Sequence, residues 1–414
     1  MTKDNSNTRT PIIRFQGFNE EWKKKKIGDI SIVLQGYGFP EKYQGQKYGD
    51  LPFCKVGDIS SAVDRGEMVI NKADNFVDYS LLPVLHAQPI PVGSTIFAKI
   101  GEAIRSNKRI KTGVPCLIDN NAAAVKSKGE ISDTFLFYLM SKVNLADYSG
   151  GIVPSVNKST IEEIDVLVPS SRDEQQRIAE CLEAIDQMIS AQNQKVEFLK
   201  AHKKGLMQQL FPQPGATTPA LRFTGFTGDW EVKKLGEIAD VNPKSDKLPN
   251  KFVYIDLESV ESGNLLKKNI IEVKNAPSRA QRLLKKGGIL FQMVRPYQRN
   301  NYHFYDNDGN VYVASTGYAQ IRYKDCSEYL YQYLHTDTFV DMAVSKCVGG
   351  NYPAINTTDL TNITVCLPSL AEQQKIAECL ETLDDLIAAE SKKLDSLKAH
   401  KKGLMQQLFP QPEK

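Results

Sequence analysis

Two runs of the chain combine cationic side chains with amide and aromatic groups at close spacing, a combination that suits contact with duplex DNA. Arg and Lys hydrogen-bond guanine O6 and N7 in the major groove, Asn and Gln hydrogen-bond adenine N6 and N7, and the cations also hold phosphates. The candidate residues of the first run are Lys99, Arg105, Asn107, Lys108, Arg109 and Lys111. Those of the second run are Arg279, Gln281, Arg282, Arg295, Tyr297, Gln298, Arg299, Asn300 and Asn301.

Both runs lie next to the same short landmark, Gly-x-x-[Ile/Leu]-Phe, at Gly93–Phe97 and Gly287–Phe291. The alternative for any one of these side chains is a solvated charged loop, but two clusters at equivalent positions favour DNA contact. The lysine run Lys23–Lys26 after Trp22 is weaker evidence. Its counterpart, Lys233 and Lys234, follows Trp230 in the same way, so both runs are also compatible with flanking a strand.

Catalytic motifs are missing from the sequence. It contains no GxxxxGK[ST] phosphate loop, no GxGxxG after a strand, no HExxH and no GxSxG, and no Asn/Asp-Pro-Pro-aromatic run of the amino-methyltransferase type. The seven cysteines are odd in number and form no CxxC, which argues against a disulfide framework or a cysteine zinc site. His202 and His400 are flanked by lysines and are predicted to lie on a solvated or partner-facing stripe. We expect no catalytic residue and no metal site.

The composition is that of an ordinary globular protein, with 41% hydrophobic and 24% charged residues among 414. A net charge of +3 says little about partners, so any DNA surface depends on local clustering. The polar start, MTKDNSNTRT, shows no signal peptide, and no apolar run of 18 residues occurs. These features predict a soluble, cytoplasmic protein without membrane contact.

The chain carries an internal repeat. The sixteen residues LKAHKKGLMQQLFPQP stand at both Leu199–Pro214 and Leu397–Pro412, and EQQ[R/K]IAECL precedes each copy. The segments that begin the two halves of the chain, here called the half-starts, also match: they are IRFQGFNEEW from Ile13 and LRFTGFTGDW from Leu221. The repeat predicts two similar units, each with a variable α+β domain followed by a nearly identical helix.

The repeated helices are expected from about Asp173 to Leu210 and from Ala371 to Leu408. Their apolar residues recur at steps of four and three, which is typical of a coiled coil. This seam consists of Ile178, Leu182, Ile185, Ile189, Val196, Leu199, Leu206 and Leu210, and of Ile376, Leu380, Leu383, Ile387, Leu394, Leu397, Leu404 and Leu408. Polar residues interrupt both copies at matched positions, Gln192 and Lys203 in one, Glu390 and Lys401 in the other. Matched interruptions favour mutual pairing over the alternative that each helix packs separately on its own domain.

Such helices span on the order of 50 Å at about 1.5 Å per residue, which makes them a spacer. Because the first domain has no preceding helix, the order also suggests a circularly permuted pseudo-dimer, in which the second helix returns to the first domain. The expected organisation is an N-terminal arm 1–12, domain 13–170, helical spacer 171–214, linker 215–220, domain 221–369 and helical spacer 370–414.

Short runs rich in β-formers predict the strands of both domains. They are 30–34, 51–56, 94–99, 122–126 and 164–168 in the first domain, and 252–256, 288–293, 311–314 and 363–367 in the second. Ser132–Ser141 and Ser327–Leu334 are predicted as equivalent helices. A further shared landmark, Gly-Gly-x-x-Pro followed by an Asn, occurs at Gly150–Asn157 and Gly349–Asn356. The order of the strands does not follow from the sequence.

These motifs together resemble the specificity (S) subunit of type I restriction-modification enzymes, over essentially the whole chain. The half-starts, both landmarks, Pro169-Ser and Pro368-Ser, and the Glu-Gln-Gln-[Arg/Lys]-Ile-Ala helices carry the resemblance. It implies an α+β fold of two similar target-recognition domains joined by two long helices in a coiled coil, with pseudo-twofold symmetry.

The resemblance also implies a function for each part. The two domains would each recognise one half of a bipartite double-stranded DNA site, while the helices fix their spacing and dock two methyltransferase (M) subunits. Restriction (R) subunits would join this core. Such a chain is non-catalytic and needs no cofactor, since S-adenosylmethionine belongs to the M subunit that methylates adenine N6, and ATP and Mg to the R subunit.

Two other functions stay open at this point. A coiled-coil scaffold that binds protein partners through two heads would show no salt-sensitive duplex binding. A stand-alone methyltransferase or nuclease would bind a methyl donor or turn over alone. For the S-subunit interpretation we expect two different half-sites with centres roughly one duplex turn, about 10 bp, apart.

Overall fold

The computed structural model describes residues 9–245, 247–306 and 308–410. Its contacts divide the chain into two compact units. Unit 1 comprises the described parts of Met1–Val196 and Glu390–Lys414, and unit 2 is Glu197–Ala389. The arm predicted over 1–12 lies mostly outside the described residues. Each of the two long helices, α6 (Arg172–Leu210) and α11 (Leu370–Leu408), contributes one part to each unit.

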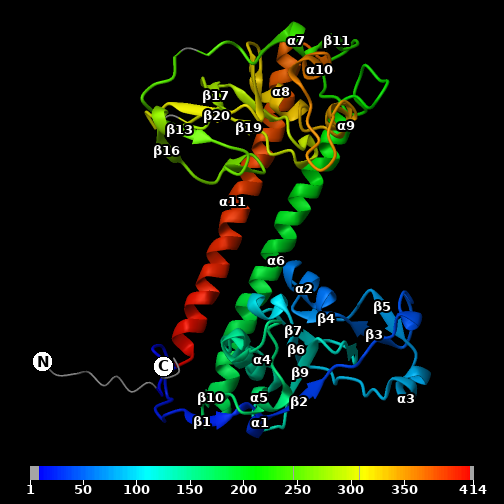
Figure 1. The fold of residues 1–414 in the computed structure, drawn as a ribbon, viewed down its shortest axis with the longest axis vertical. Helices are drawn as coiled ribbons and strands as arrows, with labels where there is room; N and C mark the ends of the chain where they lie inside the picture. The colour runs from blue at the N-terminus through cyan, green and yellow to red at the C-terminus, as the bar shows by residue number, and fades with distance from the viewer. Residues whose placement is uncertain (1–8, 246, 307, 411–414) are drawn as a thin grey trace, which may run out of the picture. The chain divides into compact units, whose positions relative to one another are not determined.

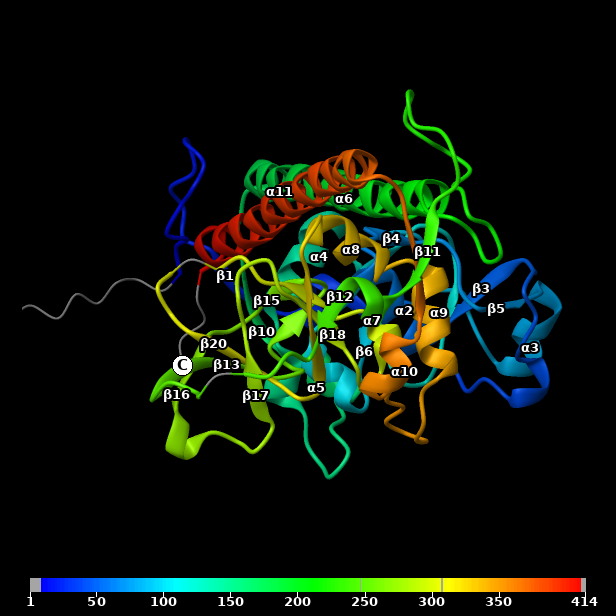
Figure 2. The ribbon, with the colours of Figure 1, turned by 90° about the horizontal axis from the view of Figure 1, so that it is seen from above.

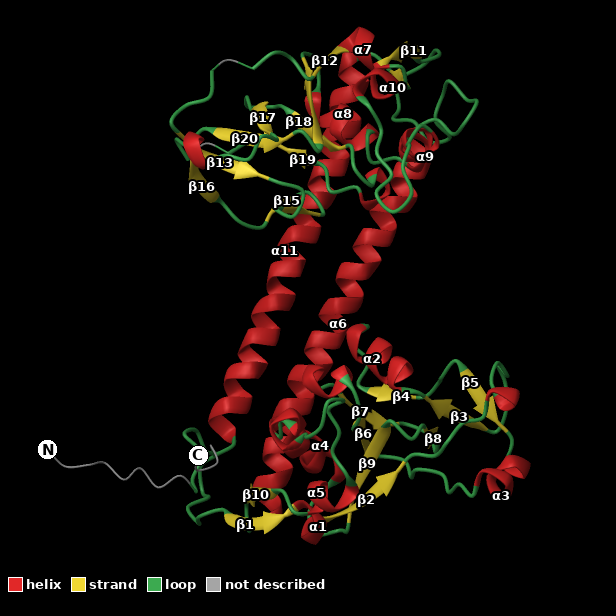
Figure 3. Cartoon of the chain, viewed as in Figure 1, coloured by secondary structure: helices red, strands yellow, loops and turns green. Residues whose placement is uncertain are grey.

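Unit 1 contains a five-stranded sheet in the order β2-β9-β6-β7-β4 and a three-stranded sheet in the order β5-β3-β8. Helix α4 lies between the larger sheet and α6 (Figures 1 and 3), while β3, β5 and α3 form an edge of the unit away from α6 (Figure 2). The elements outside α6 and α11 are β1 Lys23–Lys26, α1 Ile27–Ile30, β2 Ser31–Gln35, η1 Glu41–Tyr43, β3 Leu51–Cys54, α2 Val56–Asp64, β4 Val69–Ile70, β5 Asn75–Val77, η2 Tyr79–Leu81, α3 Leu82–Leu85, β6 Thr95–Ala98, η3 Glu102–Ser106, β7 Arg109–Thr112, β8 Leu117–Ile118, β9 Ala122–Ser127, α4 Asp133–Lys142, η4 Leu145–Tyr148, α5 Lys158–Glu162 and β10 Asp165–Val168.

Unit 2 repeats this plan with two four-stranded sheets, β12-β21-β18-β19 and β16-β13-β20-β17. Helix α8 packs between the first of these sheets and α11, because buried residues of all three share one core. The elements are β11 Glu231–Lys234, α7 Leu235–Ile238, β12 Ala239–Val241, β13 Lys251–Ile255, β14 Val260–Glu261, β15 Asn264–Leu265, β16 Asn269–Glu272, η5 Val273–Asn275, β17 Ala280–Leu283, β18 Ile289–Gln292, η6 Pro296–Gln298, β19 Tyr302–His303, β20 Tyr312–Ser315, β21 Tyr318–Tyr323, α8 Ser327–Tyr333, α9 Asp337–Ser345, α10 Thr357–Thr361 and β22 Thr364–Leu367.

The predicted α+β fold with two similar domains and two long helices is confirmed, and the predicted strands and helices are present within one or two residues of their expected bounds. Ser132 begins α4 as foreseen, since its hydroxyl accepts a hydrogen bond from Phe135 N at 3.1 Å. Several elements were not predicted, among them α2, α9 and the 3₁₀ turns η3 and η6.

The helices pair within each unit, in antiparallel directions. In unit 1 Lys401 lies 2.6 Å from Asp186, and Gln192 donates to Glu390 Oε2 at 2.6 Å. In unit 2 the repeat-equivalent pair, Lys203 and Asp384, lies at 2.6 Å. The polar interruptions of the apolar pattern are therefore partnered across the helix pair, as expected of residues that fix register.

All sixteen predicted seam residues are buried or half-buried. Those near the helix ends have a second role, because Ile178, Leu182, Leu404 and Leu408 pack in the core of unit 1 and their equivalents pack in the core of unit 2. The alternative of separate packing is therefore correct only for the ends of the helices, which pack on the domains. Elsewhere α6 and α11 pack on each other.

The return of the second helix to the first domain is visible in an aromatic cluster. Phe409, at the end of α11, lies 5.8 Å from the ring of Trp22 and 5.7 Å from that of Phe135. In unit 2 the repeat-equivalent Phe211 lies 5.6 Å from Tyr329, which contacts Trp230. Each unit therefore completes its core with the end of the helix that follows the other domain, in agreement with the circularly permuted order.

The half-start motif has a structural role. Arg14 donates to both carboxylate oxygens of Glu174 at 2.7 and 2.8 Å, and the side chain of Glu174 is only 1% exposed. Arg222 holds Glu372 in the same way in unit 2. The [Ile/Leu]-Arg-Phe segment thus fastens the start of each domain to the first turn of its long helix.

The remaining expectations concern cysteines and membranes. All seven cysteines are free thiols, and each is buried or half-buried. Within the described residues, none of the helices combines the length and the apolar character needed to cross a lipid bilayer.

Candidate nucleic-acid interface

The first predicted cluster lies on the turn between β6 and β7 of unit 1. The 3₁₀ turn η3 begins after Gly101, at φ +82°, and ends at Asn107, at φ +50°. Ile104 is fully buried and anchors the turn, while Arg105 is exposed and pairs with Glu102 at 3.1 Å. A solvent-exposed ion pair of this kind contributes little, so the Arg105 guanidinium is available to an anionic ligand.

Three cations of this cluster are not available, and the structure corrects their expected role. Arg109 is 7% exposed, lies 4.8 Å from the ring of Phe97 and donates to Asn107 Oδ1 at 2.8 Å. Burial lowers the pKa of Arg109 to about 9. Lys111 is 8% exposed and pairs with Glu183 of α6 at 2.8 Å, and Lys99, 9% exposed, donates to Gln35 at 2.8 Å. These side chains join the turn to the domain core and to α6.

Lys108 is half-buried and lies 2.7 Å from Asp64 of α2, which leaves its ammonium partly accessible. Asn107 is likewise half-buried, with its amide oxygen engaged by Arg109. Of the six residues proposed in unit 1, Arg105 is thus fully at the surface, and Lys108 and Asn107 lie beside it.

The second cluster occupies the equivalent turn of unit 2, after β18. Arg295 and Arg299 flank η6 and both have positive φ, at +54° and +55°. Tyr297 and Gln298, inside the turn, are exposed. Arg299 is held by Asp337 at 2.6 Å and by the carbonyl of His335 at 3.1 Å, so it fixes the turn to α9.

Asn301 and Asn300 also act within the protein. Asn301 is 1% exposed and its Oδ1 accepts a hydrogen bond from Gln292 N at 2.8 Å, which overturns its expected role in base contact. Asn300 is half-buried and accepts a bond from Ser262 N at 3.1 Å. Both side chains shape the connection to β19.

The segment 279–282 does not join the η6 turn. Residues 280–282 lie on β17, at the edge of the sheet β16-β13-β20-β17, and Arg279 directly precedes that strand, whereas η6 follows a strand of the other sheet. Arg279 and Gln281 are exposed, and Arg282 is half-buried, which lowers its pKa. These residues form a separate polar edge of unit 2.

The lysine runs form strands. β1, which consists of Lys23–Lys26, pairs with β10, and β11 pairs with β22 in the same register. Lys24, Lys25 and Lys26 form ion pairs with Asp165, Glu130 and Glu163. The runs were expected at most to flank a strand, and in the structure they are themselves strands. His202 and His400 lie exposed on α6 and α11.

One exposed segment with similar chemistry, which was not predicted, lies in the connection between β2 and β3 of unit 1. Lys42, Gln46, Lys47 and Tyr48 are exposed there, and Lys42 lies 4.7 Å from the centre of the Tyr43 ring. The alternation of Lys, Tyr and Gln in KYQGQKY was the signal that would have found it.

Both η turns contact a short hairpin. The N–H of Gly101 donates to the carbonyl of Pro154 at 2.8 Å, and the N–H of Arg295 donates to the carbonyl of Pro353 at 2.7 Å. The hairpins are the Gly-Gly-x-x-Pro landmarks of the sequence, so each unit places one η turn and one hairpin side by side.

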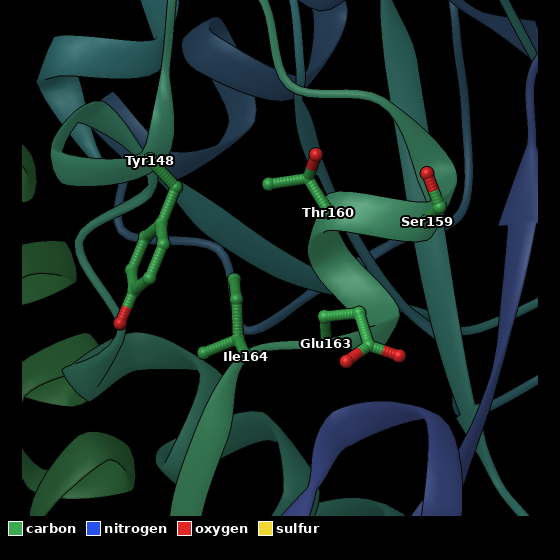
Figure 4. A pocket seen from close by; sticks show the side chains of 5 residues that line it. All are labelled: Tyr148, Ser159, Thr160, Glu163 and Ile164. Atoms are coloured by element: carbon green, nitrogen blue, oxygen red, sulfur yellow. The ribbon is translucent and has the colours of Figure 1, made fainter.

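The pocket in Figure 4 is an open depression between η4 and α5, lined by Tyr148, Ser159, Thr160, Glu163 and Ile164. Its carboxylate, Glu163, is the ion-pair partner of Lys26. Among the residues that the structure describes, no group of three or more His, Cys, Asp and Glu is placed to hold a metal ion.

Comparison with protein families decides the class of this chain. The model described as "Type I restriction modification DNA specificity domain" matches residues 19–201 and 227–399, one copy for each half. The chain belongs to this family. The type I restriction enzyme MjaVIII specificity subunit of Methanocaldococcus jannaschii is 25% identical over 409 residues, 94% of this chain and 92% of that protein.

A second relative, the type I restriction enzyme HindI specificity subunit of Haemophilus influenzae, is 31% identical over 169 residues, 38% of this chain and 36% of its own. Among solved structures, the type I restriction-modification S subunit from M. genitalium covers 98% of this chain and 100% of its own, with a TM-score of 0.60 and 14% identity. That likeness shows the fold. The chain is a type I DNA specificity subunit, the non-catalytic component of such a system, and the coiled-coil scaffold is not favoured.

Proposed function

We propose that the two units of this specificity subunit recognise two different halves of one bipartite, asymmetric DNA site. The observation that carries the proposal is the pair of η turns. Both begin at a positive φ and hydrogen-bond a hairpin proline, yet they expose different side chains, Arg105 in one and Tyr297 and Gln298 in the other. A shared backbone with different exposed groups suits the recognition of different bases.

The proposal includes the parts of the system outside this chain. Two M subunits, which carry S-adenosylmethionine and methylate adenine N6, dock on the helices, and R subunits that use ATP and Mg complete the enzyme. The helices set the spacing of the half-sites. The assembly works in the cytoplasm, where its double-stranded DNA substrate lies.

Single-turn variants test the assignment of half-sites. Arg105→Ala is expected to weaken binding by about 1–3 kcal/mol, if it contacts a guanine edge, and to relax sequence preference in the first half-site only. The double variant Tyr297→Ala with Gln298→Ala is expected to act on the second half-site only. Binding of the assembled complex to DNA libraries randomised in one half-site, with mapping of methylated adenines, measures both effects.

Arg65→Ala is the matched control, because Arg65 is an exposed arginine of unit 1 outside the η3 turn. A continuous or palindromic methylated site contradicts the proposal, as does binding that none of the turn variants alters.

The proposed docking of two M subunits rests on repeat-equivalent exposed apolar residues. Met188 on α6 is 54% exposed, and Leu386, its equivalent on α11, is 40% exposed. Two copies of one partner require two equivalent contacts, and an exposed apolar side chain on a helix supplies one. These two residues therefore mark the proposed docking faces.

Each single variant, Met188→Lys or Leu386→Lys, is expected to reduce the bound M subunits from two to one, because a buried lysine opposes docking. The double variant should bind none. Native mass spectrometry of the complex gives the ratio, with the exposed Gln194→Lys as a control. Full 2:1 assembly by the double variant places the docking faces elsewhere on the chain. Methyl transfer by the isolated chain contradicts its non-catalytic role.

A further inference from the structure

Each unit carries a short hairpin beside its η turn. In unit 1 the N–H groups of Gly150 and Ser155 each donate to the other residue's carbonyl at 3.3 Å, and in unit 2 Val348 and Ala354 do the same at 3.0 Å. Gly151 and Gly349 turn the chain at φ +89° and +105°. We call the segments Gly150–Ser155 and Val348–Ala354 the tip hairpins.

The frame around both tip hairpins is the same. Each is followed by an Asn that caps a short helix, because Asn157 Oδ1 accepts from Thr160 N and Asn356 Oδ1 accepts from Asp359 N, both at 2.8 Å. The residue between each hairpin and its Asn is also held, because Val156 N donates to Lys99 O at 2.9 Å and Ile355 N donates to Met293 O at 3.0 Å. The hairpins are thus fixed by backbone bonds to the segments that lead into the η turns.

The side chains at the tips are large, apolar and exposed. Ile152 is 105% exposed and Val153 is 61% exposed, while Ile104 and Ile161 of the same domain are completely buried. At the other tip Tyr352 is 67% exposed and Val348 is 71% exposed. Large exposed side chains on the corresponding hairpin of two domains indicate a contact surface, whereas a single exposed residue would not.

The tips differ in the way that the η turns differ. The frame Gly-Gly-x-x-Pro is constant, but its two variable positions are Ile152 and Val153 in one unit and Asn351 and Tyr352 in the other. A partner that docks in the same way on both units favours side chains of the same chemistry, such as the apolar Met188 and Leu386 on the repeated helices. Variation on a constant frame favours a ligand that differs between the units, which two unlike DNA half-sites are.

The charge beside the tips suits the same ligand. Arg105 is exposed on the turn next to the first hairpin. At the second hairpin the Arg295 guanidinium lies 4.2 Å from the centre of the Tyr352 ring and donates to Asn351 O at 3.1 Å. The arginine holds the tyrosine ring in place and adds positive charge to the surface on which a base or phosphate would lie.

We propose that the tip hairpins are a second specificity element of each unit, in addition to the η turns. Ile152 and Val153 make apolar contacts with bases of the first half-site, such as contacts with thymine methyl groups. Asn351 and Tyr352 contact the second half-site through an amide and an aromatic ring. The inference rests on the proposed function, that each unit binds its own half-site.

The test compares tip variants on intact and scrambled DNA, with the specificity subunit assembled with its M subunits. The double variant Ile152→Ala with Val153→Ala is expected to lose roughly tenfold in affinity for the intact site, as for one lost base contact. On DNA whose first half-site is scrambled, the double variant and the unsubstituted complex should bind with the same affinity. Asn351→Ala with Tyr352→Ala should show the converse pattern. Because the replaced side chains are exposed, unfolding midpoints should match those of the unsubstituted protein.

A substitution in the DNA addresses the contact itself. Replacing thymine by deoxyuridine in the first half-site removes the methyl groups and should weaken the unsubstituted complex but not the Ile152→Ala, Val153→Ala complex. Equal losses on intact and scrambled DNA overturn the inference. So does failure of both tip variants to bind M subunits, which identifies the hairpins as a docking surface. If Arg105→Ala alters the first half-site and the tip variant does not, the inference fails alone; if neither does, the proposed function fails with it.

Discussion

A chain that ends after Pro214 is expected to form a two-fold dimer. In the full chain, unit 1 takes Leu408 and Phe409 into its core, next to Trp22. Leu210 and Phe211 occupy the same places in the repeated segment, so a second copy of the shortened chain can supply them. A monomer would lack this contribution, and losing one buried phenylalanine costs about 3–5 kcal/mol. Light scattering measures the association.

The ion pairs of the helices favour the same dimer. Lys203 of the second copy replaces Lys401 beside Asp186, and Gln192 meets its own equivalent in place of Glu390. With the M subunit, this dimer is expected to methylate a palindrome made of the first half-site and its inverted repeat. Phe211→Ala in the shortened chain should weaken the dimer. A well-folded monomer, or an unchanged asymmetric site, contradicts the interchangeability of the two helix ends.

The substitution Arg14→Ala is expected to lower the free energy of unfolding of unit 1 by about 3–5 kcal/mol, because Glu174 would remain as a buried charge without its arginine partner. Arg222→Ala should do the same to unit 2 through Glu372, which is also 1% exposed. The chain has two tryptophans, Trp22 in unit 1 and Trp230 in unit 2. Denaturant unfolding of Trp230→Phe and Trp22→Phe variants, followed by fluorescence, therefore reports each unit separately.

Two controls separate burial from charge. Lys24→Ala breaks an exposed pair with Asp165 and should cost about 0–1 kcal/mol. Arg14→Met combined with Glu174→Met removes both charges and should cost less than Arg14→Ala alone. Equal effects of Arg14→Ala and Lys24→Ala would show that the half-start arginine does not fasten the domain to its helix.

The parts of the fold that follow local rules were predictable from the sequence. The apolar period located α6 and α11, and matched interruptions such as Gln192 and Glu390 indicated their pairing. Strand order was not predictable, because it depends on pairings between distant segments, as in the parallel pair of β13 and β20. The double role of seam residues such as Ile178 also required the structure, since period alone does not say which surface a helix face meets.

The candidate interface shows the same limit at the level of single residues. Composition identified the turn after β6, but it could not separate Arg105, which faces solvent, from Arg109, which packs on Phe97. The alternation of β7 does not help, because all four of its residues are buried by neighbouring elements. The exposed Ile152 carries no charge, so composition did not mark it as a contact residue, although the Gly-Gly and Pro around it are typical of an exposed turn.

The core of unit 1 contains Phe409, while unit 2 is formed from Glu197–Ala389 alone. During synthesis on the ribosome, the domain that is made first must therefore wait for roughly 200 further residues, about 10–40 s at the usual rate of elongation. Over that time its open aromatic cluster is exposed to chaperones, to proteases and to neighbouring nascent chains. All segments of the second domain are synthesised before the last segment of the first domain. The second domain can therefore complete its fold first, although it is translated second.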